Sequence, residues 1–205
     1  MSPKILLASK SPRRRELLTG LGLDVEVIAS NAHTLGYFPG DEEVHENEAP
    51  ADYVVRTALE KFREGLFLKE KLGYDAGLVV VAADTVVSLG SEILGKPADR
   101  AEAERFMREL SGRTHDVRTC VVVGTSEKDV RHLVSHSKVT FKTLTEEEVV
   151  RYAATDEPYD KAGGYGIQGR ASLFISRIEG SFTGIMGLPL FETGSLLGSF
   201  GIELL

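Results

Sequence analysis

The sequence has a single cysteine, Cys120, in 205 residues. One cysteine cannot form a disulfide within the chain, so we expect a reducing compartment. No apolar run is long enough to span a bilayer. The N-terminus lacks a secretory pattern, because its short apolar stretch is followed by Lys10 and three arginines. We therefore expect a cytoplasmic protein with no membrane contact.

Basic residues are in the minority, 24 against 31 acidic ones, and the formal net charge is −7. Such an acidic chain is a poor candidate for binding a nucleic-acid backbone. The hydrophobic share of 42% and the charged share of 27% are ordinary for a globular protein, which excludes disorder and rod-like repeats. We expect one domain over residues 1–205, with two lobes sharing one cleft.

Several familiar catalytic patterns are missing. There is no Walker loop and no Ser/His/Asp arrangement. Cys120 lies in an apolar stretch without a neighbouring base, so we expect it to pack inertly. The five histidines show no metal-ligand spacing, and we expect them at the surface or in strands. They are His33, His45, His115, His132 and His136.

Strand and helix patterns alternate along the chain, which predicts an α/β fold with a central mixed sheet flanked by helices. We expect strands at 5–8, 25–28, 78–83, 117–123 and 134–142, with a hairpin at 90–91. We expect helices at 12–20, 50–72, 98–110 and 189–197, a short helix after Thr145, and a long loop over 29–49.

A basic cluster follows the first strand. Ser11 and Pro12 are typical of a helix start, and Arg13, Arg14 and Arg15 lie on its first turn. Free N–H groups at a helix N-terminus, together with arginines, suit a polyanion such as a triphosphate. A solvated basic face is the alternative, but the position directly after a buried strand favours phosphate binding.

Three further features could bind a ligand or take part in catalysis. Asp84 follows the most apolar strand, and we place it at that strand's carboxyl end, where it could hold a divalent cation, activate water or cap a turn. Lys96, between Gly95 and Pro97, is restrained in a way that suits an anion. The segment 157–169 has four glycines within seven residues, which let a backbone approach a ligand closely, although glycines also serve simple turns.

Six segments together resemble the Maf family of nucleoside triphosphate pyrophosphatases, in the family's order and over nearly the whole chain. They are Leu7–Arg14, Ala83–Val87, Gly95–Pro97, Leu110–His115, Glu157–Gly169 and Gly187–Leu190. The resemblance implies a two-lobed fold related to inosine-triphosphate pyrophosphatases. It also implies hydrolysis of a nucleoside triphosphate to the monophosphate and pyrophosphate with a divalent cation, Mg²⁺ or Mn²⁺. Family members are cytoplasmic, often homodimeric, and linked to septum formation.

The resemblance also assigns residues by position. Asp84 corresponds to the catalytic proton acceptor, and we take it as the metal ligand too. The substrate-binding positions correspond to Ser9, Arg13, Arg14, Lys61, Lys96 and Lys161. Arg13, Thr85 and Gln168 match the subgroup acting on dTTP and UTP, whereas the 7-methyl-GTP subgroup tends to carry Trp, Gln and Glu there. The Gln168 amide could pair with N3–H and a carbonyl of uracil or thymine.

The chain departs from the family after the second strand. The usual acidic motif is replaced by Ala29-Ser30-Asn31-Ala32-His33, and the nearest acids are Asp41, Glu42 and Glu43. Either the loop folds one of these carboxylates back, or metal binding relies on Asp84. A nucleotide-binding regulator of cell division with little turnover is therefore the alternative to an enzyme. If the protein is an enzyme, the sequence leaves open whether it prefers modified nucleotides.

Overall fold

The computed structural model describes residues 2–28 and 43–205, and these form a mixed sheet of seven strands flanked by helices. The strand order is β2-β1-β3-β5-β6-β7, with β4 paired to β3. The strands are β1 (Lys4–Leu7), β2 (Asp24–Val27), β3 (Val80–Leu89), β4 (Glu92–Leu94), β5 (Thr114–Ser126), β6 (Asp129–Phe141) and β7 (Ile175–Glu179). The helices are α1 (Pro12–Gly20), α2 (Pro50–Lys71), α3 (Arg100–Leu110), α4 (Glu146–Ala153), α5 (Phe182–Ile185) and α6 (Leu190–Gly198).

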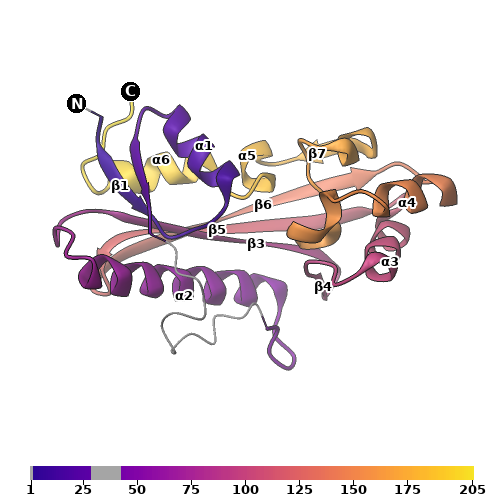
Figure 1. Ribbon diagram of the computed structural model, residues 1–205, viewed down its shortest axis with the longest axis horizontal. Helices are drawn as coiled ribbons and strands as arrows, with labels where there is room; N and C mark the ends of the chain where they lie inside the picture. The colour runs from indigo at the N-terminus through magenta and orange to yellow at the C-terminus, as the bar shows by residue number, and fades with distance from the viewer. Residues whose placement is uncertain (1, 29–42) are drawn as a thin grey trace.

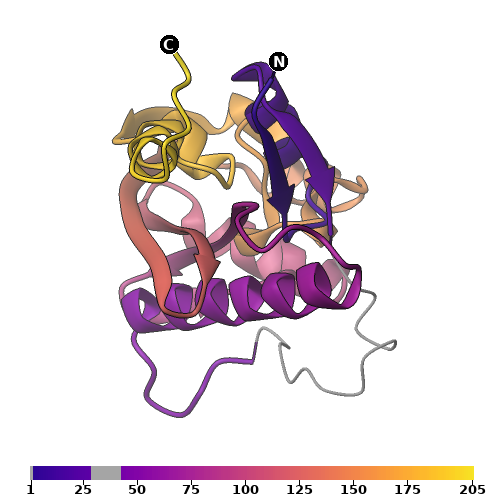
Figure 2. The same ribbon diagram turned by 90° about the vertical axis from the view of Figure 1, so that its left-hand side faces the viewer.

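The helices cover the sheet in three groups (Figures 1 and 2). Helix α2 lies along one face, and α1, α5 and α6 lie over the other, while α3 and α4 sit at the end near β4. Each group closes its own apolar cluster. Under α2, for example, Val54, Ala58 and Phe62 pack with Ala82 and Val122. The predicted α/β fold with a mixed central sheet is therefore confirmed.

The helix starts follow the sequence signals. Ser11 caps α1 with its side chain, and Pro12 occupies the first turn, where the missing N–H costs nothing. Thr145 and Glu148 form a capping box at α4. The sequence patterns did not predict β7 or α5, which are short and lie in a glycine-rich region. None of the helices in the described part of the chain is long and apolar enough to cross a membrane.

Strand β3 corrects the predicted position of Asp84. We expected the strand to end at residue 83, but it continues to Leu89 because its second half pairs antiparallel with β5, from Asp84 opposite Cys120 to Ser88 opposite Asp116. Asp84 therefore lies mid-strand, and the rule for carboxyl ends of parallel strands does not place it.

The neighbours of β3 explain why a mid-strand residue is accessible. On one edge, the pairing with β1 reaches Val81, and the pairing with β4 begins at Val87. Between these two points, the edge of β3 opens into a cleft that Asp84 and Thr85 line. Of the predicted 29–49 loop, residues 29–42 lie outside the described residues, and these include Asp41 and Glu42.

Candidate active site

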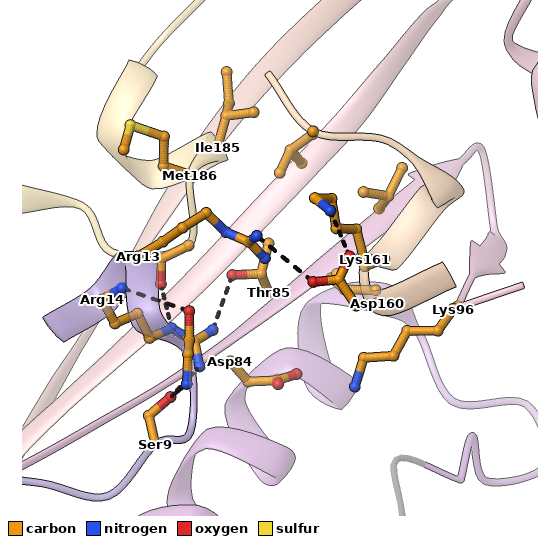
Figure 3. A pocket seen from close by; sticks show the side chains of 18 of the residues that line it. Ser9, Arg13, Arg14, Asp84, Thr85, Lys96, Asp160, Lys161, Ile185 and Met186 are labelled. Atoms are coloured by element: carbon orange, nitrogen blue, oxygen red, sulfur yellow. Dashed lines mark hydrogen bonds and ion pairs between the residues drawn. The ribbon is translucent and has the colours of Figure 1, made fainter. Parts of the chain in front are cut away.

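The cleft has a volume of about 1360 Å³ and runs along the open edge of β3. It brings together the three clusters that the sequence predicted, from the β1–α1 turn, from β3 with the segment that follows β4, and from the glycine-rich segment (Figure 3). Its lining includes every proposed site residue: Ser9, Arg13, Arg14, Lys61, Asp84, Thr85, Lys96, Lys161 and Gln168. Arg15, which we grouped with the basic cluster, is not among the lining residues.

Asp84 and Thr85 face opposite sides of the sheet, because successive strand residues alternate. Asp84 faces α2 and is only 5% exposed. Its Oδ2 accepts a hydrogen bond from Thr57 Oγ1 at 2.7 Å, and its Oδ1 forms an ion pair with Lys61 Nζ. A buried carboxylate needs such partners, since burying an uncompensated charge is costly. The pairing keeps Asp84 in place at the cleft.

Thr57 is a site residue that sequence reasoning missed. Its side chain is buried, and its hydroxyl also lies 2.9 Å from Tyr53 O, one turn earlier in α2. The one signal in the sequence is its spacing, since Thr57 precedes Lys61 by four residues and so shares its helix face. Nothing in the sequence pairs that face with Asp84, because the contact depends on how α2 docks on the sheet.

Thr85 faces the opposite side, toward α1 and α5. Its Oγ1 lies 2.9 Å from Thr119 Oγ1 on β5, and Thr119 Oγ1 donates to Gly184 O of α5 at 2.7 Å. Thr119 is buried and is the register partner of Thr85. A line of hydrogen bonds therefore joins β3, β5 and α5 behind the cleft wall.

Arg14 fastens the first helix to the opposite wall of the cleft. Its Nε donates to Gly187 O at 2.7 Å, its Nη1 to Ser9 Oγ at 3.1 Å, and its Nη2 to Thr85 Oγ1 at 3.4 Å. Ser9 Oγ also accepts from Ser11 N at 3.2 Å. The guanidinium carries five N–H donors in a planar fork, which lets this one side chain reach Gly187, Ser9 and Thr85 together.

The glycine-rich segment folds as short 3-10 turns around Glu157. The Glu157 carboxylate accepts from Arg170 N at 2.7 Å and from Tyr152 Oη at 3.1 Å. A Cβ at Gly169 would lie within 2.5 Å of this carboxylate, and one at Gly163, where φ is +71°, would collide with Val87. Contacts inside the protein therefore favour glycine at these two positions, which supports the structural alternative for them.

Two charged residues mark the rim of the same segment. Asp160 forms an ion pair with Lys161 and lies 3.7 Å from Arg13 Nη1, across the cleft from α1. Lys161 Nζ also donates to Glu157 O at 2.9 Å. Figure 3 shows Arg13 reaching to Asp160, with Lys96 extending into the cleft from the segment that follows β4. The basic side chains thus surround the opening above Asp84.

His115 lies on strand β5, one of the two positions expected for the histidines, and its side chain is buried behind the glycine-rich segment. Its Nε2 lies 2.7 Å from Tyr165 Oη, and burial lowers the pKa of His115 to about 4. The imidazole is therefore neutral at physiological pH. Tyr165 lines the cleft with the segment that carries Gln168, so the His115–Tyr165 pair supports that wall from inside the core.

Cys120 pairs in register with Asp84 on the neighbouring strand and is fully buried. Burial, together with the nearby Asp84 carboxylate, raises the pKa of the Cys120 thiol to about 12. The thiol therefore stays protonated, and the predicted inert packing of Cys120 is confirmed.

Fold and cleft together define a class: an α/β protein whose cleft holds one buried carboxylate ringed by arginines and lysines, suited to a phosphorylated ligand. Residues 4–200 match the model of the Maf-like protein family, and the chain belongs to this family. The family assignment made from the six sequence segments is therefore confirmed.

Relatives named dTTP/UTP pyrophosphatase match over nearly the full length. The chain is 48% identical to the dTTP/UTP pyrophosphatase of Bordetella avium, covering 98% of each chain. It is 47% identical to the dTTP/UTP pyrophosphatase of Aromatoleum aromaticum, covering 98% of this chain and 97% of that protein. The dITP/XTP pyrophosphatase structure from Mycobacterium abscessus aligns over 69% of this chain and 75% of its own, with 22% identity and a TM-score of 0.39, a likeness too low to carry an argument.

Proposed function

We propose that this protein hydrolyses dTTP and UTP to the monophosphate and pyrophosphate. Water attacks the α-phosphorus, the bond from that phosphorus to the oxygen bridging the β-phosphate breaks, and pyrophosphate leaves. The observation that carries the proposal is the buried Asp84 carboxylate at the open edge of β3, beneath a cleft lined by basic side chains. Full-length relatives named dTTP/UTP pyrophosphatase support the same reaction.

Asp84 is the proton acceptor in this proposal. The attacking water loses a proton to the carboxylate, whose two oxygens are oriented by Thr57 and Lys61. Each carboxylate oxygen has two acceptor sites, so the contacts to Thr57 and Lys61 leave room for the water. Positioning and charge neutralisation supply most of the rate in phosphoryl chemistry.

The triphosphate lies over the N-terminal turn of α1. Backbone N–H groups there suit an anion, and Ser9 and Arg13 add side-chain donors to the same wall. Lys96 and Lys161 approach from the opposite walls. Five N–H donors on each arginine, in a fixed fork, match the geometry of phosphate oxygens.

The donor set around Asp84 fits a hard divalent cation. In the described residues, no group of three or more His, Cys, Asp or Glu side chains could hold a metal, so a closed zinc-like site is not formed there. Mg²⁺ is commonly held by one or two carboxylates, water and substrate phosphates, and Asp84 supplies one such carboxylate. When bound, Mg²⁺ or Mn²⁺ would neutralise the charge that develops on the phosphate oxygens.

Base selection is assigned to Arg13, Thr85 and Gln168, all of which line the cleft. Gln168 is exposed on the glycine-rich wall and offers both a donor and an acceptor to a pyrimidine. A homodimer and a cytoplasmic location, which the resemblance implied, stay predictions; the molar mass measured by light scattering during gel filtration tests the first.

A nucleotide panel tests the activity directly. Pyrophosphate release is measured for dTTP, UTP, CTP, ATP and GTP with Mg²⁺ and with Mn²⁺. We expect dTTP and UTP to be hydrolysed well ahead of ATP and GTP. Comparable rates for all of them would overturn the assignment to the pyrimidine subgroup. Tight nucleotide binding without pyrophosphate release would favour the regulator instead of the enzyme.

A further inference from the structure

The hydrogen bonds behind Thr85 can run in only one direction. Thr119 Oγ1 lies 2.7 Å from Gly184 O, and a carbonyl oxygen has no proton to donate. Thr119 must therefore donate to Gly184 with its single hydroxyl proton. The 2.9 Å contact between Thr85 Oγ1 and Thr119 Oγ1 is then a hydrogen bond only when Thr85 donates to Thr119.

Arg14 reinforces this direction. Its Nη2 donates to Thr85 Oγ1 at 3.4 Å, and a guanidinium cannot accept a hydrogen bond. The proton of the Thr85 hydroxyl thus points into the protein, toward Thr119. Thr85 lines the cleft, whereas Thr119 is only 1% exposed. A ligand therefore meets the Thr85 oxygen and not its proton.

We propose that Thr119 is a positioning residue that makes Thr85 an acceptor-only group, and that Thr85 thereby selects a pyrimidine whose ring N3 carries a proton. This inference rests on the proposed function and deepens it. Uracil and thymine carry N3–H and can donate to Thr85. Cytosine has a bare N3, which is an acceptor and would face the lone pair of Thr85. The arrangement therefore favours UTP and dTTP over CTP.

Gln168 cannot make this distinction by itself. Its side-chain amide has a carbonyl oxygen on one side and an NH₂ group on the other. Turning the amide over lets it donate to the C4 carbonyl of uracil in one orientation and accept from the C4 amino group of cytosine in the other. The Thr85 hydroxyl has no such freedom while Thr119 holds its proton. Thr85 thus fixes the choice that Gln168 leaves open.

The test measures binding, so that it does not depend on turnover. Dissociation constants for the α,β-methylene analogues of UTP and CTP are determined by calorimetry for the wild type and for variants. In the complex with the CTP analogue, Thr85 Oγ1 and cytosine N3 would face each other as two acceptors without a proton between them. This costs about as much as one hydrogen bond, so we expect the wild type to bind the UTP analogue about 10-fold more tightly.

Variants separate the two threonines. Thr119→Val removes the acceptor for the Thr85 proton, which can then turn to the cleft and donate to cytosine N3. We expect this variant to bind the CTP analogue more tightly than the wild type does, and to lose the preference. Thr119→Ser keeps the hydroxyl, so we expect it to keep the preference for the UTP analogue. Thr85→Val loses the preference without any gain for the CTP analogue.

Ser137→Ala is the matched control for the α5 wall. Ser137 is buried on β6, and its Oγ accepts from Ser181 N at 3.0 Å, at the start of α5. The variant loosens the same segment that Thr119 holds at Gly184 but leaves the Thr85 hydroxyl untouched. We expect the wild-type preference in Ser137→Ala. The same loss in Ser137→Ala as in Thr119→Val would overturn the proposal, because the effect would then come from the segment.

Two other outcomes have distinct meanings. If Thr119→Val changed the preference for UTP over dUTP analogues but not for UTP over CTP, Thr85 would contact the ribose, and the selection of the base would be overturned. If the wild type prefers the UTP analogue but releases no pyrophosphate from UTP, the proposed activity fails while the binding preference holds.

Discussion

The two sides of β3 at the cleft differ in how their side chains are held, although Asp84 and Thr85 are neighbours in the chain. On the α2 side, the Asp84 carboxylate is held by the Lys61 ammonium group and by the Thr57 hydroxyl. On the α5 side, a neutral hydroxyl is held by Thr119. Each residue thus has a buried threonine behind it. The charged side suits proton transfer, and the neutral side suits discrimination between bases.

The two buried threonines also differ in freedom. The Thr57 proton has three acceptors within reach, Tyr53 O, Val54 O and Asp84 Oδ2. Thr119 Oγ1 donates its proton to Gly184 O at 2.7 Å and accepts a hydrogen bond from Thr85 Oγ1. Because the two networks lie on opposite faces of the sheet, catalysis and base selection should be separable by mutation.

The largest expected effect is on the charged side. Asp84→Asn keeps the side-chain volume but removes the negative charge needed to accept a proton and to hold a cation. We expect turnover of UTP to fall by about 10²-fold or more, since a general base alone contributes roughly 10²–10⁴-fold. The preference for the UTP analogue over the CTP analogue should not change. Pyrophosphate release and calorimetry measure these two quantities.

The outcome of Asp84→Asn is read together with its fold. Far-UV circular dichroism and the melting temperature show whether the variant folds as the wild type does. A folded variant that keeps more than about a tenth of wild-type turnover would remove Asp84 from the role of proton acceptor.

A smaller effect is expected at the glycine-rich wall of the cleft. Gln168→Glu replaces an amide with a carboxylate that can only accept hydrogen bonds. A carbonyl of uracil would then face a negative charge, so we expect kcat/KM for UTP to fall by about 10- to 100-fold. Guanine nucleotides, which donate through N1–H and N2–H₂, should lose less.

Gln168→Asn serves as the control, because it keeps the amide and shortens the side chain. Rates for UTP and GTP are compared in both variants by pyrophosphate release. Equal losses on UTP and GTP in Gln168→Glu would mean that the added charge repels the triphosphate and that Gln168 does not read the base.

The sequence predicted the charged side better than the neutral one. Asp84 and Lys96 stand in local patterns, an apolar strand and a Gly-Lys-Pro turn, that indicate chemistry without knowledge of the fold. Thr119 has no local signal, because its role depends on the antiparallel register that places it opposite Thr85. Thr57 depends in the same way on the docking of α2. Long-range pairing sets both contacts, and periodicity in one segment does not encode it.

The same limit explains the misplaced strand end and the buried histidine. The run 78–83 is continuously apolar and therefore visible as a buried strand, but the rest of β3 is held by pairing with β5 and β4. His115 lies on β5, where alternation gives it an inward position. Burial of a polar side chain can be predicted only when its hydrogen-bond partner, here Tyr165, is known.

The smallest effect among these variants is expected from Thr57→Val, which sharpens the contrast between the two threonines. Valine has nearly the shape of threonine but cannot donate to Asp84 Oδ2. We expect kcat for UTP to fall by about 10-fold, since one hydrogen bond to a charged group contributes roughly 1.5 kcal/mol or more. KM should hold, because Thr57 is buried behind Asp84. The preference for UTP over CTP should hold as well, in contrast to Thr119→Val.

Thr193→Val is the matched control for Thr57→Val. Thr193 is also a buried helical threonine whose hydroxyl donates to a carbonyl four residues earlier, Pro189 O at 2.7 Å. It lies on α6 and is not among the cleft residues, so its loss should lower stability without lowering kcat. Thr57→Ser should regain most of the turnover because it restores the hydroxyl. If Thr57→Val lowered the melting temperature as Thr193→Val does but kept wild-type kcat, Thr57 would only stabilise the helix and would not orient Asp84.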